Sequence, residues 1–163
     1  MNRVRLLIMA AVAIPLLIVA ANIVLVDSTP IASSNDIHYS SFKIGDRAFA
    51  LTYLATNQSA LQKGLMNTKV NDDTTELFVF PNSAYYSFWM FDVNSSLDMM
   101  WIVADSGSNV GKVVYLELNA PPCHVIVACT SYHPTSRADL VLEAKGGFAQ
   151  TNGVKVGTTV VFS

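Results

Sequence analysis

The feature that most constrains this chain is an uncharged apolar stretch near the N-terminus, which leaves the remaining sequence to form any water-exposed domain. Leu6 to Val26 is a run of 21 residues without a charged side chain. As a helix rising about 1.5 Å per residue it would be about 32 Å long, which matches the hydrocarbon core of a bilayer. The sequence therefore predicts a transmembrane helix over residues 6–26.

Charges around this stretch predict its orientation. Arg3 and Arg5 precede it, and no Lys or Arg follows until Lys43. The positive-inside rule leaves residues 1–5 in the cytoplasm and the rest outside, so we expect a single-pass protein of the cell membrane. The alternative is a signal peptide cleaved near Ala20, with a secreted product, although the run exceeds the usual length of about 7–15 apolar residues.

The rest of the chain has the size of one domain. Residues 27–36 read as a polar linker, and residues 37–163 as a single extracytoplasmic domain. The net charge of the whole chain is −2, and no basic run occurs. We therefore expect the membrane as a partner through the N-terminal helix and expect no nucleic-acid partner.

Short apolar runs bounded by turn residues predict a domain made mainly of strands. Residues 39–44 and 47–54 read as a hairpin with Gly45-Asp46 as its turn, and the alternation of Phe49, Leu51 and Tyr53 predicts one buried face. Further strands are expected at residues 77–80, 86–91, 99–104, 112–118, 140–144 and 159–162.

Helix signals are few. Thr56 is a candidate N-cap for a short helix that runs through Lys63, and Gly64 is a plausible stop. Leu65 and Met66 would then enter the core, and a second helical turn is expected near residues 147–151. The sequence predicts a mainly β (α+β) domain with one clear short helix.

Several blocks, taken in their order and spacing, resemble the domain of unknown function 192 family over roughly residues 45–163. The blocks are residues 55–66, Leu77–Pro81, Phe88–Met90, Leu97–Ile102, Asp105–Gly107 and Val141–Glu143. The resemblance implies a compact mixed β domain, rolled towards a barrel, with the short helix packed on it. It implies no particular reaction, because the family has no settled activity.

Two departures from the family pattern remove positive charge. The family commonly has Lys-Asn-Thr after Phe-Trp-Met, where this chain has Phe91-Asp92-Val93, and an arginine where this chain has Thr68. If the family holds an anion or a sugar acid with those cations, the resemblance implies that this chain does not.

Asp98 and Glu143 are the acids within the blocks that resemble the family. One interpretation pairs them near Trp89 as the two carboxylates of a carbohydrate-processing site. The other interpretation is structural, with each acid capping a turn or accepting backbone hydrogen bonds, and nothing in the sequence indicates a perturbed pKa. We favour the structural interpretation.

The middle of the domain is rich in aromatic residues. Phe88 and Trp89 are adjacent on a predicted strand, so their rings point to opposite faces and one of them must leave the main core. We expect Trp89, with Tyr86 and Met66, to line a groove for a small-molecule or carbohydrate ligand.

Four methionines and two histidines could be read as a copper site, but no pattern concentrates them, and methionine more often fills gaps in a core. These residues are Met66, Met90, Met99, Met100, His124 and His133. We expect no metal and no cofactor.

Cys123 and Cys129 are the only cysteines, and outside the membrane such a pair predicts a disulfide. An extended segment would separate their Cα atoms by roughly 20 Å, whereas a disulfide needs about 4.4–6.8 Å. The intervening residues, 124–128, are therefore expected to fold back as a loop.

Two functional hypotheses follow. The first is a membrane-anchored ligand-binding or accessory module with an aromatic groove. The second is a hydrolase-type enzyme that uses Asp98 and Glu143. The sequence has no nucleophile elbow, phosphate-binding loop or zinc-protease motif, which favours the module over the enzyme.

Overall fold

A computed structural model describes residues 38–105 and 108–163 of the chain. The predicted transmembrane segment at residues 6–26 and the predicted linker lie outside these ranges. Among the residues that the structure describes, no helix is long and apolar enough to cross a membrane.

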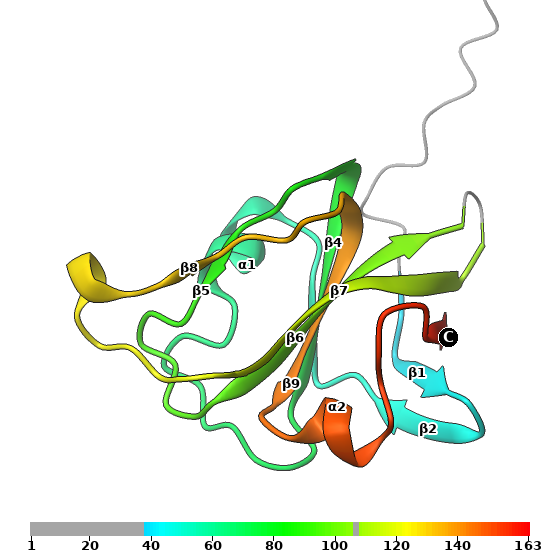
Figure 1. Ribbon diagram of the computed structural model, residues 1–163, viewed down its shortest axis with the longest axis horizontal. Coiled ribbons are helices and arrows are strands. Elements are labelled where there is room, and N and C mark those ends of the chain that lie inside the picture. The colour runs from blue at the N-terminus through cyan, green and yellow to red at the C-terminus, as the bar shows by residue number, and fades with distance from the viewer. Residues whose placement is uncertain (1–37, 106–107) are drawn as a thin grey trace, which may run out of the picture. The chain divides into compact units, whose positions relative to one another are not determined.

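The domain is mainly β, as predicted. In the described part of the chain, eight strands form one sheet in the order β2-β1-β10-β7-β6-β9-β4-β3, and β5 pairs with β8 in a separate small sheet (Figure 1). The strands are β1 (Ser41–Ile44), β2 (Arg47–Ala50), β3 (Tyr53–Ala55), β4 (Thr75–Ala84), β5 (Phe88–Trp89), β6 (Leu97–Ala104), β7 (Val110–Ala120), β8 (Ser131–Tyr132), β9 (Ala138–Lys145) and β10 (Thr159–Phe162).

The large sheet curls into a half-barrel around an apolar interior. Phe42 of β1 and Phe162 of β10 share one buried cluster with Leu77 of β4 and Leu142 of β9, although neither β1 nor β10 is next to β4 or β9 in the sheet. At one end, the Thr75 hydroxyl of β4 donates a hydrogen bond of 2.8 Å to the carbonyl of Ala50 at the end of β2. The curling expected from the resemblance is therefore present as a half-barrel.

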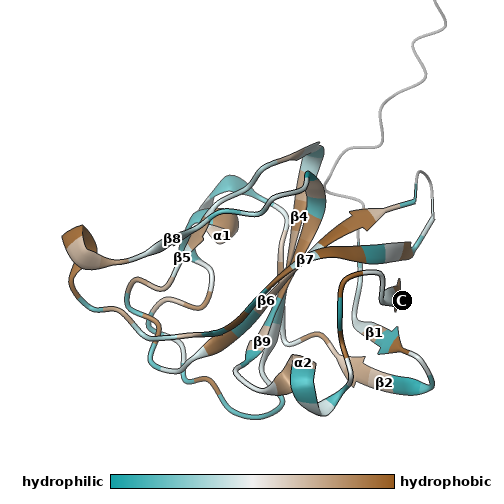
Figure 2. Ribbon diagram, viewed as in Figure 1, coloured by the Kyte–Doolittle hydropathy of each residue, from teal (hydrophilic) through white to brown (hydrophobic). Residues whose placement is uncertain are grey.

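Strands β6 and β9 and the first half of β4 (residues 75–79) are buried on both faces, which explains the apolar runs that they contain (Figure 2). We call the face with Leu142 and Met100 the inner face, because it lines the half-barrel. The outer face carries a second cluster that includes Phe78, Trp101 and Val141. Leu65, just after α1, packs against this outer cluster, as do residues of β5 and β8.

Helix α1 (Gln58–Lys63) begins one residue later than predicted. Asn57, and not Thr56, is the N-cap, because the Asn57 side chain accepts a hydrogen bond from the Ala60 amide at 3.0 Å. Gly64 ends the helix with φ of 50°, a conformation that glycine adopts without a side-chain penalty. The second predicted helical turn is present as α2 (Phe148–Thr151).

The predicted hairpin turn at Gly45-Asp46 is present, but its second strand is not continuous. The Leu51 amide donates to the Ser40 carbonyl and the Thr52 amide to the Thr75 carbonyl, so the chain leaves β2 and re-enters the sheet as β3, parallel to β4. Tyr53 is 44% exposed, so the predicted alternation does not bury it. The predicted burial of Tyr53 was wrong, because hydrogen bonds to distant parts of the chain redirect the backbone after β2.

The strand predicted at residues 86–91 is shorter, since only Phe88 and Trp89 pair with β8. Met90 instead turns into the outer cluster. The other predicted strands are present, and β4, β6, β7 and β9 extend beyond the predicted ends because paired strands continue past the purely apolar residues.

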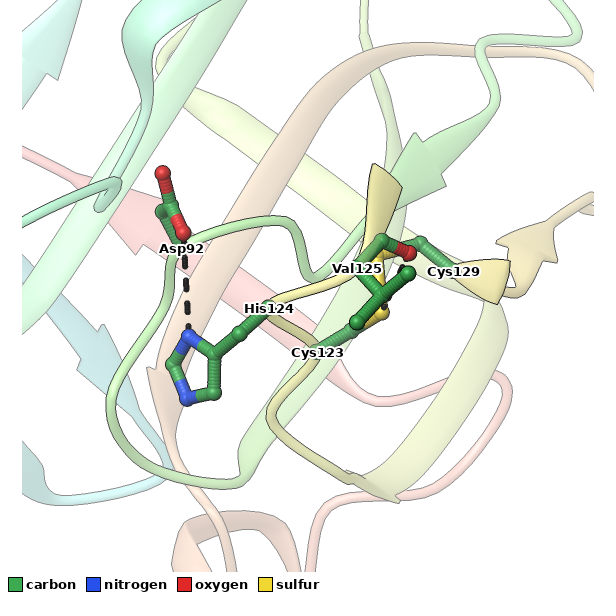
Figure 3. Close-up of a disulfide and its surroundings, with 5 residues drawn as sticks. All are labelled: Asp92, Cys123, His124, Val125 and Cys129. Atoms are coloured by element: carbon green, nitrogen blue, oxygen red, sulfur yellow. Dashed lines mark hydrogen bonds and ion pairs between the residues drawn. A yellow bond between two sulfur atoms is a disulfide. The ribbon is translucent and has the colours of Figure 1, made fainter. Parts of the chain in front are cut away.

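Cys123 and Cys129 form the predicted disulfide, with their Cα atoms 5.6 Å apart (Figure 3). The residues between them do fold back, through a short 3-10 turn at Ile126–Ala128. The Cys123 amide and carbonyl also bond to Met90 and Asp92, so the loop is tied to the segment that follows β5.

Candidate functional site

A cavity of about 430 Å³ lies against the outer face, between the end of α1, strand β4 and the segment around β5. Its lining is mostly apolar and aromatic, with Glu143 and Lys63 as the charged exceptions. The lining residues are Leu61, Gln62, Lys63, Gly64, Leu65, Met66, Phe78, Phe80, Tyr86, Ser87, Phe88, Trp89, Val93 and Glu143.

Stacked and edge-on aromatic rings form one wall of this cavity. Phe88 packs edge-on against Phe78, with ring centroids 4.8 Å apart. Tyr86 stacks on Phe80 at 3.6 Å. Trp89 points the other way and is 43% exposed. Of the two adjacent rings, Phe88 is therefore the one in the core and Trp89 the one that leaves it.

The two other residues expected to bind a ligand line the same cavity as Trp89. Tyr86 is held by its backbone, since its carbonyl accepts a hydrogen bond of 2.8 Å from the indole of buried Trp101. Met66 follows α1, and its amide bonds to the Lys63 carbonyl. Trp89, Tyr86 and Met66 thus come from segments apart in sequence and meet at one cavity.

A pair of buried glutamates lies at one part of the cavity, which we call its inner end: Glu143 lines it and Glu76 lies beside it. Glu143 on β9 lines the cavity although it is only 4% exposed, and Glu76 on β4, 5% exposed, is its direct partner in the strand register. Side chains opposite each other on paired strands have Cβ atoms about 4.5–5.5 Å apart. Glu76 Oε2 has no hydrogen-bond partner among the described residues.

Burial and mutual repulsion favour the protonated form of this pair. Burial raises the pKa of Glu76 to about 7, against a smaller lowering by the Lys63 ammonium. Burial, together with the Glu76 charge, raises the pKa of Glu143 well above its usual value. The pair therefore holds at least one proton near neutral pH.

Asp98 lies on the inner face and does not reach this cavity. It is the register partner of Ala144, whereas Glu143 is the partner of Met99, so the two acids project from opposite faces. Asp98 Oδ1 accepts from the Asn119 amide and Oδ2 from the Ala149 amide, both at 2.8 Å. The structure gives Asp98 the backbone-bonded environment of the structural interpretation and does not bring it to Glu143.

Sequence reasoning missed Glu76 and Lys63. The signal for Glu76 was an acidic residue at the start of the apolar run Thr75–Phe80, two positions before Phe78 and therefore on the same face. The predicted strand began at Leu77 and so excluded it. Lys63 gave no signal, since a lysine in the last turn of a helix is common.

The methionines and histidines considered for copper are dispersed. Met99 and Met100 lie on opposite faces of β6. His133 Nδ1 bonds to the Ser87 hydroxyl at 2.6 Å, and His124 lies 3.7 Å from the Asp92 carboxylate (Figure 3). Among residues 38–105 and 108–163, no group of three or more His, Cys, Asp or Glu side chains could hold a metal ion.

The positions where the chain departs from the family pattern lie beside the cavity. The Phe91 ring is 5.6 Å from the Trp89 ring, and the Asn67 amide, one residue before Thr68, bonds to the Asp92 carbonyl. Lys63 is the one basic side chain among the residues that line the cavity.

A family model for DUF192, described as Uncharacterized ACR, matches residues 41–162. The chain is similar to the crystal structure of a protein of unknown function from Novosphingobium aromaticivorans DSM 12444, with a TM-score of 0.60 and 24% identity over 74% of this chain and 81% of that one. It is also similar to a protein from Sinorhizobium meliloti 1021 described as a candidate transcription regulator, with a TM-score of 0.61 and 25% identity over 78% of this chain and 97% of that one. No curated protein matches.

Proposed function

We propose that this chain, which belongs to the DUF192 family, is a membrane-anchored extracytoplasmic module that holds a small ligand in the cavity beside α1. The observation that carries the proposal is the cavity itself, with half-exposed Trp89 at one wall and buried Glu143 at its inner end. Ligand sites in proteins are typically concave, mostly apolar, and supplied with a few polar groups that orient the ligand.

The composition of the cavity supports binding more strongly than catalysis. A half-exposed tryptophan offers a flat face on which a ring or a sugar can stack. The neighbouring rings of Tyr86 and Phe88 are fixed by packing, so they lose little entropy when a ligand arrives. These features favour a ligand with an apolar or ring-shaped body.

A ligand screen on the full-length protein in detergent tests this function. Aromatic and sugar-like compounds are added, and binding is measured by thermal shift and by tryptophan fluorescence. A bound ligand should change the emission of exposed Trp89 more than that of buried Trp101. Trp89→Ala should weaken any hit at least about tenfold, a typical effect for a central aromatic contact. Tyr85→Ala, at an exposed ring outside the cavity lining, is the control. Equal weakening by both variants would contradict the proposal.

The membrane anchor is tested separately. A reporter that is active only in the cytoplasm is fused after Ser163, and a second reporter that is active only outside is fused at the same place. The positive-inside charges predict signal from the outside reporter alone. A cytoplasmic signal equal to that of a cytoplasmic control would reject this topology.

Hydrolase-type chemistry is the second candidate. Since Asp98 belongs to the inner face, an acid pair at the cavity would be Glu76 and Glu143, and burial, which raises the pKa of Glu143, suits a carboxyl group that acts as a general acid. Under this alternative, Glu143→Gln removes turnover of a chromogenic glycoside while leaving binding intact. Absence of any turnover by the unaltered protein would reject it.

Transcription regulation, the role described for the Sinorhizobium protein, is not part of our proposal. The net charge of −2 and the lack of a basic run give this chain no electrostatic attraction to nucleic acid.

A further inference from the structure

We propose that the cavity takes a ligand with a positively charged amine, whose ammonium group is held at the inner end by Glu76 and Glu143 and whose body lies along the aromatic wall. This inference rests on the proposed binding function and names the chemical class of its ligand.

The first argument is an unmet need for hydrogen-bond donors. Glu76 Oε2 is buried and has no partner among the described residues, a state that costs free energy unless something else supplies a donor. It lies next to the cavity wall, since a Cβ added at Gly64 would come within 3.9 Å of it. An ammonium group carries three donors, enough for both carboxyl groups.

The contrast with Asp98 shows that this lack of donors is specific to the cavity side. The same sheet supplies two backbone amides to the fully buried Asp98, so the fold can satisfy a buried carboxylate where it has a purely structural role. Glu143 instead lines the cavity, and Glu76 Oε2 lies beside Gly64 in the cavity wall. A buried acceptor that faces a cavity is one that a ligand can reach.

The second argument is charge. Two carboxyl groups on directly opposed residues repel each other when both ionise, and a cation between them removes that repulsion. The aromatic lining favours the same charge, because aromatic rings attract cations and Trp89, Tyr86 and Phe88 line the cavity.

The charged and titratable groups around Glu76 and Glu143 do not prevent a cation from binding between them. Lys63 from α1 is exposed, so water screens its repulsion of an incoming cation. Lys145, two residues beyond Glu143 on β9, is engaged by Asp72. Strand β3 presents Tyr53 beside Glu76, β5 is preceded by Tyr86, and β6 presents the uncharged Met99.

The size of the cavity sets the scale of the ligand. About 430 Å³ accommodates a small molecule with one ring and a short amine-bearing chain, at the lower end of typical ligand pockets of about 300–1,000 Å³. Phenethylamine has this form, and phenethyl alcohol and 3-phenylpropionate are its neutral and anionic counterparts.

Titration calorimetry of the full-length protein in detergent with these three probes tests the proposal. At about pH 8 the amine should bind at least about tenfold more tightly than the alcohol, and the anion should bind most weakly. Amine affinity should fall between about pH 8 and about pH 5, because the pair then holds protons that the amine must displace. Buffers of different ionisation enthalpy should report proton release on binding.

Glu143→Gln and Glu76→Gln should each remove the preference for the amine while the alcohol still binds. Asp98→Asn, a buried acid on the inner face, is the matched control and should keep the preference in the folded protein. Equal binding of amine and alcohol, or an amine preference that survives both glutamine variants, would overturn the amine assignment alone. If none of the three probes binds, both the assignment and the cavity's proposed binding function fail.

Discussion

The two faces of the central strands provide different hydrogen-bond partners for a buried carboxyl group. On the inner face, Asp98 is 0% exposed and accepts two backbone hydrogen bonds, which tie β6 to the β7 bulge at Asn119 and to the start of α2. On the outer face, Glu76 and Glu143 are almost as buried, but they are directly opposed on paired strands and Glu143 lines a cavity. Burial alone therefore does not distinguish a structural acid from a candidate binding acid.

The difference lies in what surrounds each carboxyl group. Two backbone amides hold the Asp98 carboxyl group at a fixed position, so Asp98 connects β6 to the end of β7 and to α2. The glutamate pair, in which Glu76 Oε2 has no donor among the described residues, keeps at least one proton near neutral pH and remains able to exchange it. On the inner face, both carboxyl oxygens of Asp98 accept hydrogen bonds that stabilise the fold. On the outer face, Glu76 Oε2 has no partner among the described residues and can accept a hydrogen bond from a ligand.

The largest expected effect is the loss of Asp98. Asp98→Ala leaves the buried Ala149 amide and the part-buried Asn119 amide without acceptors, at a cost of about 1–3 kcal/mol each, so the free energy of unfolding should fall by about 4 kcal/mol. Urea unfolding of the two proteins measures this. Asp98→Asn retains one acceptor and should lose about half as much. A loss below about 1 kcal/mol for the alanine variant would remove the contrast between the faces.

The pH dependence of stability is the next effect. The folded-state pKa of Glu76 is raised from 4.5 to about 7, so the folded state binds more protons, and this stabilisation is present below about pH 4.5 and lost as pH rises through 7. The expected loss between about pH 4.5 and 8 is about 3 kcal/mol from this residue, and the raised pKa of Glu143 acts in the same direction.

Urea unfolding of the protein at several pH values measures this slope, with Glu76→Gln as the comparison, whose slope should be flatter. Asp72, whose pKa is lowered by Lys145, acts in the opposite direction but at more acid pH, so it does not obscure the window. Stability that rises with pH between about 5 and 8 would mean that the outer-face pair is ionised in the folded protein.

Reduction of the disulfide should lower the free energy of unfolding by less than the two changes above. The loop closed by Cys123 and Cys129 is short, and the loop-entropy estimate gives about 2 kcal/mol. Thermal unfolding with and without reductant measures it, and a Cys123→Ser, Cys129→Ser variant insensitive to reductant is the control. Alkylation of the unfolded, unreduced protein provides a direct check, since two added groups would mean free thiols.

The smallest expected effect is that of Trp89→Phe. Because Trp89 is 43% exposed, the smaller ring leaves little buried void, and the free energy of unfolding should change by less than about 1 kcal/mol. Trp101→Phe, at a fully buried ring, is the matched comparison and should cost several times more. Urea unfolding of both variants decides whether Trp89 belongs to the cavity or to the core.

Much of the fold was predictable because local patterns agree with it. The short apolar runs between turn residues predicted the strands, and Gly45 and Gly64 predicted where a turn forms and where α1 ends. The break between β2 and β3 was not predictable, because it depends on the hydrogen bond from the Thr52 amide to the distant Thr75 carbonyl. Local alternation carries no information about such a partner.

The sequence by itself determined that one of Phe88 and Trp89 leaves the core, because adjacent residues of a strand point to opposite faces. It also determined that residues 124–128 must fold back if Cys123 and Cys129 are joined, because an extended segment is too long. Only the tertiary structure decided that Glu143 is paired with Glu76 and not with Asp98. Strand register sets which side chains face each other, and register follows from pairing among β4, β9 and β6, which lie far apart along the chain.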